Sequence, residues 1–280
     1  MHPIYQNIKQ ALKGCCSDSE ASALAKMLLV EVLGFSTLEL FGGKDKEVSE
    51  KDLDVLDKML ERLKNNEPIQ YVIGRETFCG MTFEVNPTVL IPRPETQELV
   101  EWITHEYKAA SSCRMLDIGT GSGCIAVSLA KKLPAARVEA WDISEGALEV
   151  ARRNAGINGV SVAFRLQDVL KAEVSSPSYE VMVSNPPYIT HREKMEMEAN
   201  VLEWEPHTAL FVPDTDPLLF YRKIAQLGVK ALADGGSLYF EINRAYGKET
   251  VEMLQGLGYR QIELKKDMFG NERMIKAIKP

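Results

Sequence analysis

The stretch "RMLDIGTGSGCIAVSLA", from Arg114 to Ala130, decides the fold of this chain. It starts as a strand-like apolar run, passes through three glycines and continues with helical apolar spacing. A glycine-rich turn between a strand and a helix is a context in which α/β sheets bind nucleotides. The order of Gly119, Gly121 and Gly123 is G-x-G-x-G, which is not the dinucleotide fingerprint, and no Lys-Ser or Lys-Thr pair follows as in a P-loop.

Strand and helix patterns alternate from Thr96 to the C-terminus. This alternation predicts an α/β domain with a mainly parallel sheet and helices on both faces. We expect the strands in "RMLDIG", "RVEAWDIS", "VAFRLQD", "YEVMVSNPP", "GGSLYFEI", "YRQIELKKD" and "RMIKAIKP", and the helices at 122–133, 145–155, 218–232 and 248–257. The last two strands have no helix between them, so we expect them to pair antiparallel.

The N-terminal part reads as helical, with apolar stripes at 18–33 and 49–63. "ETFCGMTFEV" then predicts a β-hairpin around Gly80, and three prolines between Pro87 and Pro94 predict a stiff, extended segment. We therefore expect a small helical domain at 1–72, a hairpin and proline-rich linker at 73–95, and the α/β domain at 96–280.

Composition is that of an ordinary globular protein, with 45% hydrophobic and 26% charged residues over 280 positions. The net charge of −7 argues against a large basic nucleic-acid footprint. Five cysteines without C-x-x-C spacing and four scattered histidines suggest neither a disulfide framework nor a metal site. The N-terminus does not resemble a signal peptide and no apolar run is long enough for a membrane span, so we expect a cytoplasmic protein that binds no membrane.

Three acidic residues lie at the ends of expected strands. Asp117 stands just before the glycines, and Asp142 and Asp168 end the next two strands. Asp142 can accept hydrogen bonds from both ribose hydroxyls, and Asp168 from an adenine amino group, with Val169 beside the ring. Asp117 repels a pyrophosphate but can hold a cationic amino-acid group. Together with the glycine loop these residues predict a pocket for S-adenosyl-L-methionine, whereas the alternative is a plain turn with helix-capping aspartates.

A second motif, "YEVMVSNPPYIT" (Tyr179–Thr190), ends an expected buried strand with an amide, two prolines and a phenol. Neither proline offers an N–H, and Pro187 holds Pro186 extended. The Asn185 side-chain oxygen and the Pro186 carbonyl can therefore capture an NH₂ group, and Tyr188 can offer it a flat face. Two fixed acceptors would stabilise positive charge developing on an amide nitrogen during methyl transfer, and they disfavour a carboxylate. The alternative is a proline-rich strand end without chemistry.

Several segments resemble the HemK/PrmC family, which methylates the glutamine side chain of the Gly-Gly-Gln tripeptide in class 1 peptide chain release factors. The similar segments are "PIQYVIG" (68–74), Phe78–Phe83, "LIPRPETQELV" (90–100), "LDIGTGSGCIAVSLA" (116–130) and "VSNPPYI" (183–189). They span nearly the whole chain in the family's order.

This resemblance implies a seven-stranded Rossmann-like class I methyltransferase domain behind a helical bundle and a hairpin linker. It also implies cofactor contacts at Gly119, Thr120, Gly121, Ser122, Gly123, Asp142, Asp168, Val169 and Asn185, with the substrate glutamine at Asn185, Pro186, Pro187 and Tyr188. S-adenosyl-L-homocysteine would be the product and a release factor the partner, docked by the N-terminal helices of a monomer. The alternative is that those helices serve as packing support, and we favour docking.

The sequence departs from the family pattern in two places. No glycine-rich turn follows Glu205–Leu210, and Val169 replaces a frequent aromatic residue, so it should stack less well on adenine. Arg93 and Glu95 have two interpretations: they line the cleft, or they form an ion pair that pins the linker.

Two enzymatic alternatives share this chemistry. One is a glutamine methyltransferase that acts on a ribosomal protein, and the other is an adenine-N6 nucleic-acid methyltransferase, which usually needs a basic recognition region. A catalytically silent binding module is a third class, but an eroded motif would have favoured it and both motifs are intact.

Overall fold

The computed structural model describes residues 2–42, 46–110, 112–174 and 176–280. The chain divides into two compact units. The first comprises Met1–Arg75 and Glu198–Trp204, and the second comprises Glu76–Met197 and Glu205–Pro280. Each unit has its own hydrophobic core. None of the helices seen in the described ranges is long and apolar enough to cross a membrane.

The first unit is helical. Its helices are α1 (Pro3–Ala11), α2 (Asp18–Met27), α3 (Thr37–Gly42), α4 (Glu50–Lys64), α5 (Ile69–Ile73) and α9 (Ala199–Trp204). The two helices expected here are confirmed as α2 and α4. One π-helical turn, Leu28–Val32, continues α2 to the expected stop at Gly34. The Ser49 hydroxyl caps α4 by accepting the Asp52 N–H at 3.2 Å.

The second unit is built on a seven-stranded sheet with the order β10-β11-β9-β6-β3-β4-β5. The strands are β3 (Cys113–Ile118), β4 (Ala136–Asp142), β5 (Ala163–Leu166), β6 (Tyr179–Ser184), β9 (Leu232–Glu241), β10 (Arg260–Lys266) and β11 (Glu272–Ile278). All seven expected strands are therefore confirmed. β11 lies between β10 and β9. It is antiparallel to β10, as expected, and also to β9, while the other neighbours are parallel.

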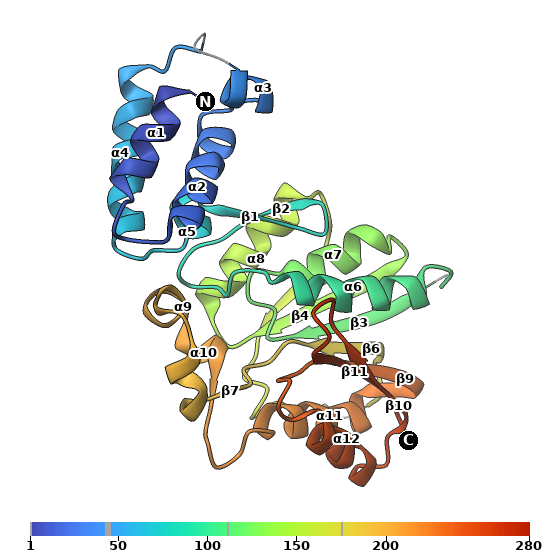
Figure 1. Ribbon diagram of the computed structural model, residues 1–280. Coiled ribbons are helices and arrows are strands. Elements are labelled where there is room, and N and C mark those ends of the chain that lie inside the picture. Colours follow the sequence, from blue (N-terminus) through green and yellow to red (C-terminus); the bar gives the residue numbers. More distant parts are fainter. Residues whose placement is uncertain (1, 43–45, 111, 175) are drawn as a thin grey trace. The chain divides into compact units, whose positions relative to one another are not determined.

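Helices cover both faces of this sheet (Figure 1). One face carries α6 (Pro94–Tyr107), α7 (Cys124–Lys132) and α8 (Glu145–Ile157), and the other carries α11 (Leu219–Ala231) and α12 (Gly247–Gly256). The prediction that the extended segment reaches Pro94 is wrong for this last proline. Pro94 opens α6 instead, because proline has a helical φ and lacks only an N–H that the first turn leaves unpaired.

A β-hairpin of β1 (Arg75–Phe78) and β2 (Met81–Glu84) precedes α6, as expected. Its two turn residues, Cys79 and Gly80, both have positive φ, +51° and +75°. That backbone is the type I′ turn, whose twist matches that of the strands. Phe78 and Phe83 then meet edge to face at 5.9 Å under the hairpin.

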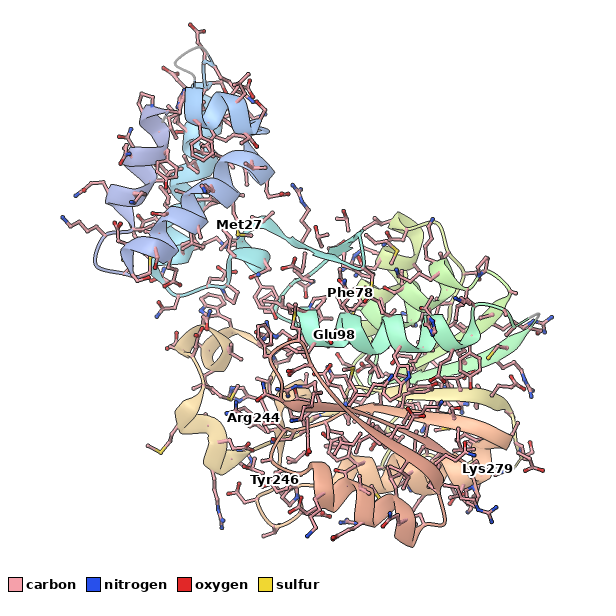
Figure 2. All side chains as sticks on the ribbon, turned by 45° about the vertical axis from the view of Figure 1, so that its right-hand side comes forward. Met27, Phe78, Glu98, Arg244, Tyr246 and Lys279 are labelled. Atoms are coloured by element: carbon pink, nitrogen blue, oxygen red, sulfur yellow. The ribbon has the colours of Figure 1, made fainter. Side chains whose placement is uncertain are left out.

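The segment after β6 forms a small structure of its own. It contains β7 (Ile189–Thr190), a 3₁₀ turn (His191–Glu196), α10 (His207–Leu210) and β8 (Phe211–Val212), and β7 pairs with β8 in parallel. Elsewhere in this unit, the β10–β11 turn lies beside α6, where the Glu98 carboxylate accepts the Met268 N–H at 3.0 Å (Figure 2).

Asn154 in α8 joins the hairpin to the glycine loop. Its Oδ1 accepts the Glu84 N–H at 2.6 Å, and its Nδ2 donates to the carbonyls of Glu84 and Ser122 at 2.9 and 2.8 Å. The side chain is completely buried. Because water cannot reach the buried Asn154 side chain, these backbone groups must satisfy its amide.

We expect Asn154→Ala to lower the free energy of unfolding of this unit by about 3 kcal/mol, since three backbone groups lose the partner that a buried amide supplies. The matched control is Asn158→Ala, one helical turn later, whose partly exposed amide bonds the Thr82 carbonyl at 2.9 Å and should cost under about 1 kcal/mol. Urea unfolding followed by circular dichroism measures both. Equal losses in the two variants would refute the special role of Asn154.

Candidate active site

A cavity of about 370 Å³ opens at the carboxyl ends of the parallel strands of the second unit. This is the edge where open α/β sheets bind ligands. The cavity brings together residues that follow β3, β4, β5 and β6. Of the predicted site residues, those in its lining are Gly119, Gly121, Asp142, Asp168, Val169, Asn185, Pro186 and Pro187.

The glycine loop is held against β4 by Asp142. The Gly121 N–H donates to Asp142 Oδ2 at 2.8 Å, and the Ser144 N–H donates to Oδ1 at 2.9 Å. Gly123 has a φ of +81°, and a Cβ there would lie 3.0 Å from the Cβ of Ala151 in α8. The loop is therefore tight because α7 and α8 meet at its end.

The two carboxylates of the lining differ in their electrostatics. Burial raises the pKa of Asp142, although the N–H groups of Ser144 and Gly121 oppose the rise. The Lys171 ammonium, 3.1 Å from Asp168 Oδ2, lowers the pKa of Asp168. With one of these bonds on each oxygen, the Asp142 carboxylate keeps lone pairs for a ligand hydroxyl.

Five predicted residues lie outside the lining: Asp117, Thr120, Ser122, Gly123 and Tyr188. The Thr120 hydroxyl donates to Asp117 Oδ2 at 2.6 Å beneath the loop. The Tyr188 hydroxyl donates to Glu241 Oε1 at 3.1 Å. The Tyr188 hydroxyl is therefore bonded to the end of β9, and the Tyr188 ring does not line the cavity.

Asn185 and Pro186 offer free acceptors to the cavity. Asn185 Nδ2 donates to Thr96 Oγ1 at 3.2 Å. Within the described ranges, neither Asn185 Oδ1 nor the Pro186 carbonyl receives a hydrogen bond. Two unsatisfied oxygens in one lining suit a ligand that carries an NH₂ group.

The charges of the lining suit S-adenosylmethionine. Asp142 and Asp168 are its ionisable members, and no lysine, arginine or histidine occurs among the described lining residues. Such a site disfavours phosphate and favours a nucleoside with cationic groups. The open glycine backbone at Gly119 and Gly121, where a Cβ would meet no atom within 4 Å, leaves room for close approach.

Comparison with known proteins decides the family. A release factor glutamine methyltransferase of Bacteroides thetaiotaomicron is 50% identical to this chain over 278 residues, which are 99% of each protein. The chain belongs to the release factor glutamine methyltransferase family. A member from Flavobacterium psychrophilum is 46% identical over 271 residues, 96% of this chain and 95% of that protein. The resemblance inferred from the motifs is confirmed.

Two family models match the chain in separate places. The PrmC N-terminal domain matches residues 4–74, and the Methyltransferase small domain matches residues 95–204. A crystal structure of a methyltransferase from Pyrococcus furiosus, 20% identical, superposes with a TM-score of 0.52 over 80% of this chain and 98% of that one. This likeness supports the fold alone, and the class I methyltransferase fold expected for the family is confirmed.

Arg93 has a partner that was not expected. Its Nη2 pairs with Glu205 Oε1 at 2.5 Å, and Glu205 Oε2 accepts the Ile91 N–H at 3.2 Å. The interpretation of an ion pair that pins the linker is therefore right for Arg93, but the partner is Glu205 and not Glu95. The Glu205 side chain is 1% exposed, so this pair fixes the linker to the segment before α10.

Several other residues of the cavity lining were not predicted as site residues. They are Thr88, Val89 and Leu90 from the linker, Pro206, Thr208, Ala209 and Phe211 around α10, and Phe220 and Ile224 from α11. Phe211 is flanked by the His191 ring, stacked at 5.4 Å, and by the His207 ring, edge-on at 5.3 Å. Only the proximity of Glu205 and Pro206 to the family's motifs pointed to this segment.

Asp117 makes the stability of this family member depend on pH. Burial raises the pKa of Asp117 to about 7, although the Thr120 hydroxyl and the Ala126 N–H oppose the rise. Since the folded state binds this proton more tightly than the unfolded state, the stabilisation present below pH 4 is lost as the pH rises through 7. We expect the melting temperature of the wild type, relative to Asp117→Asn, to fall between pH 5 and pH 8.

Differential scanning fluorimetry without added ligand measures this difference. A pH-independent difference for Asp117→Asn would contradict the raised pKa.

Proposed function

We propose that this protein methylates the side-chain nitrogen of the glutamine in the Gly-Gly-Gln motif of class 1 peptide chain release factors, with S-adenosylmethionine as donor. The observation that carries the proposal is the pair of free acceptors at Asn185 and Pro186. A relative named release factor glutamine methyltransferase matches 99% of this chain and supports it. An acceptor pair fits a primary carboxamide and disfavours a carboxylate.

In this proposal Asn185 Oδ1 and the Pro186 carbonyl accept the two N–H groups of the substrate carboxamide. Pro187 keeps Pro186 extended, so the direction of its carbonyl is fixed before substrate arrives. The amide nitrogen is a weak nucleophile because its lone pair is delocalised. As the new N–C bond forms and the sulfur–methyl bond breaks, positive charge develops on that nitrogen, and the two oxygens stabilise it. The nitrogen then loses one of its protons to solvent, which leaves the neutral N-methyl amide.

Bound S-adenosylmethionine supplies an electrophilic methyl group and leaves as S-adenosylhomocysteine. We assign its amino-acid and ribose groups to the glycine loop of Gly119–Gly123 and to Asp142, and its adenine to Asp168 and Val169. Asp117 and Thr120 support the loop from below, since their hydrogen bond lies outside the cavity lining. The chain's part is to orient both reactants and to exclude basic groups from the lining.

We further propose that residues 1–72 dock the release factor and that a monomer works in the cytoplasm. The match of the N-terminal family model to residues 4–74 supports a role tied to this family.

Transfer of radiolabelled methyl groups tests the proposal. The acceptors are purified release factor, its glutamine-to-alanine variant at the Gly-Gly-Gln motif, ribosomal proteins and duplex DNA. We expect label on the wild-type factor alone, located on the glutamine by mass spectrometry. Label on a ribosomal protein would move the substrate but keep the chemistry, while label on DNA would overturn the proposal.

A further inference from the structure

Asn185 lies at the end of a buried hydrogen-bonded chain that starts at the end of β9. The Thr96 hydroxyl, in the first turn of α6, donates to Glu241 Oε2 at 2.6 Å. Thr96 Oγ1 in turn accepts from Asn185 Nδ2 at 3.2 Å. Thr96 and Glu241 are each 2% exposed, so water does not compete for these bonds. Three elements distant in sequence, α6, β9 and the end of β6, thus meet behind the cavity.

The number of protons available sets which group donates in each of these hydrogen bonds. A threonine hydroxyl has one hydrogen, and a bond of 2.6 Å to a carboxylate is where that hydrogen is held most strongly. Thr96 Oγ1 is then able only to accept from its other neighbour. The Asn185 group that faces Thr96 must be the NH₂, which leaves Oδ1 for the cavity. An amide turned the other way would place two acceptors against each other.

We propose that Thr96 and Glu241 are positioning residues that fix which end of the Asn185 amide faces the substrate, and that they thereby set the preference for a carboxamide over a carboxylate. The inference rests on the proposed function and deepens it. With Oδ1 outward the site accepts from an NH₂ group, whereas with Nδ2 outward it would donate to a carboxylate oxygen.

Tyr188 and Arg273 support the same arrangement. The Tyr188 hydroxyl donates to Glu241 Oε1, so both carboxylate oxygens accept and Glu241 is held as an acceptor. Burial raises the pKa of Glu241, and the Thr96 hydroxyl, the Arg273 guanidinium and the Tyr188 hydroxyl oppose that rise. This gives the tyrosine of the Asn-Pro-Pro-Tyr motif a place in the network instead of on the cavity wall.

Thr96→Val tests the inference, because valine keeps the shape of threonine and removes the hydroxyl. We expect kcat for release-factor methylation to fall about 10- to 100-fold, since the Asn185 amide loses the group that orients it. Affinity for S-adenosylhomocysteine, measured by calorimetry, should stay at the wild-type value. Thr96→Ser keeps the hydroxyl and should restore most of kcat.

A binding measurement separates positioning from mere packing. Two peptides containing Gly-Gly-Gln and Gly-Gly-Glu are titrated into the protein saturated with S-adenosylhomocysteine. The wild type should prefer the glutamine peptide, and Thr96→Val should reduce the ratio of the two affinities by about fivefold or more. A loss of packing alone would weaken both peptides equally and leave the ratio unchanged.

Thr250→Val is the matched control. Thr250 in α12 is as buried as Thr96, but its hydroxyl bonds the Tyr246 carbonyl at 2.7 Å, away from Asn185. We expect this variant to keep the wild-type kcat and affinity ratio. Equal losses in Thr96→Val and Thr96→Ser, or an unchanged ratio in Thr96→Val, would overturn the inference. If the wild type methylates no release factor, the proposed function fails. The ratio of the affinities for the two peptides then still tests the inference on its own.

Discussion

Asn185→Ala lowers kcat for methylation of the release factor by about 10²- to 10³-fold, the effect seen when one preorganised group that stabilises transition-state charge is removed. The cavity then retains the Pro186 carbonyl alone, so the carboxamide is held by one acceptor instead of two. Binding of S-adenosylhomocysteine should change little, because the glycine loop and Asp142 are untouched. Stopped assays at saturating S-adenosylmethionine give kcat, and calorimetry gives the affinity.

Asn158→Ala serves as the control for Asn185→Ala. Its amide bonds the Thr82 carbonyl on the hairpin and does not line the cavity, so kcat should equal that of the wild type. The role assigned to Asn185 is wrong if Asn185→Ala loses cofactor affinity but turns over normally once the cofactor is saturating.

Asp142→Ala weakens the binding of S-adenosylhomocysteine by about 10²- to 10³-fold, since two hydrogen bonds from ligand hydroxyls to a carboxylate are lost. The substitution also removes the acceptor of the Gly121 N–H, which holds the glycine loop against β4. Both losses act on the same ligand, so this change should have the largest effect on affinity in the cavity. Isothermal titration calorimetry measures it directly.

Asp168→Asn is the comparison for Asp142→Ala. Asp168 lines the same cavity but is partly exposed and paired with Lys171. It is assigned one hydrogen bond to the adenine amino group, which the amide oxygen of asparagine can also accept, so affinity should fall by less than about tenfold. A greater loss of S-adenosylhomocysteine affinity in Asp168→Asn than in Asp142→Ala would contradict the assignment of ribose to Asp142 and of adenine to Asp168.

The strands and the glycine loop were predictable because each depends on local patterns. The G-x-G-x-G turn requires positive φ at three positions, and all three glycines have it. Asp142 could be placed because it ends the strand next to the loop, and parallel strands end at one edge. Pro94 also carried a readable signal, since a proline followed by an acidic residue is a common helix start, yet it was read as extended chain.

The network behind Asn185 was not predictable in the same way. Thr96 and Glu241 are 145 residues apart, and nothing in either segment shows that α6 and β9 bring their side chains together. The only local sign was a glutamate that follows three apolar residues at the end of β9, where an unpaired charge would be costly. Tyr188 was assigned to the substrate because the motif suggested it, whereas its hydroxyl bonds Glu241. Arg93 likewise forms its ion pair with Glu205, which lies 112 residues away in the sequence.

The most direct measurement is a crystal structure of the protein with S-adenosylhomocysteine and a peptide containing Gly-Gly-Gln. The account predicts that the glutamine carboxamide nitrogen lies within hydrogen-bond distance of both Asn185 Oδ1 and the Pro186 carbonyl, with the cofactor sulfur on the opposite side of that nitrogen. A carboxamide bound elsewhere, or an Asn185 amide that turns its NH₂ toward the peptide, would contradict it.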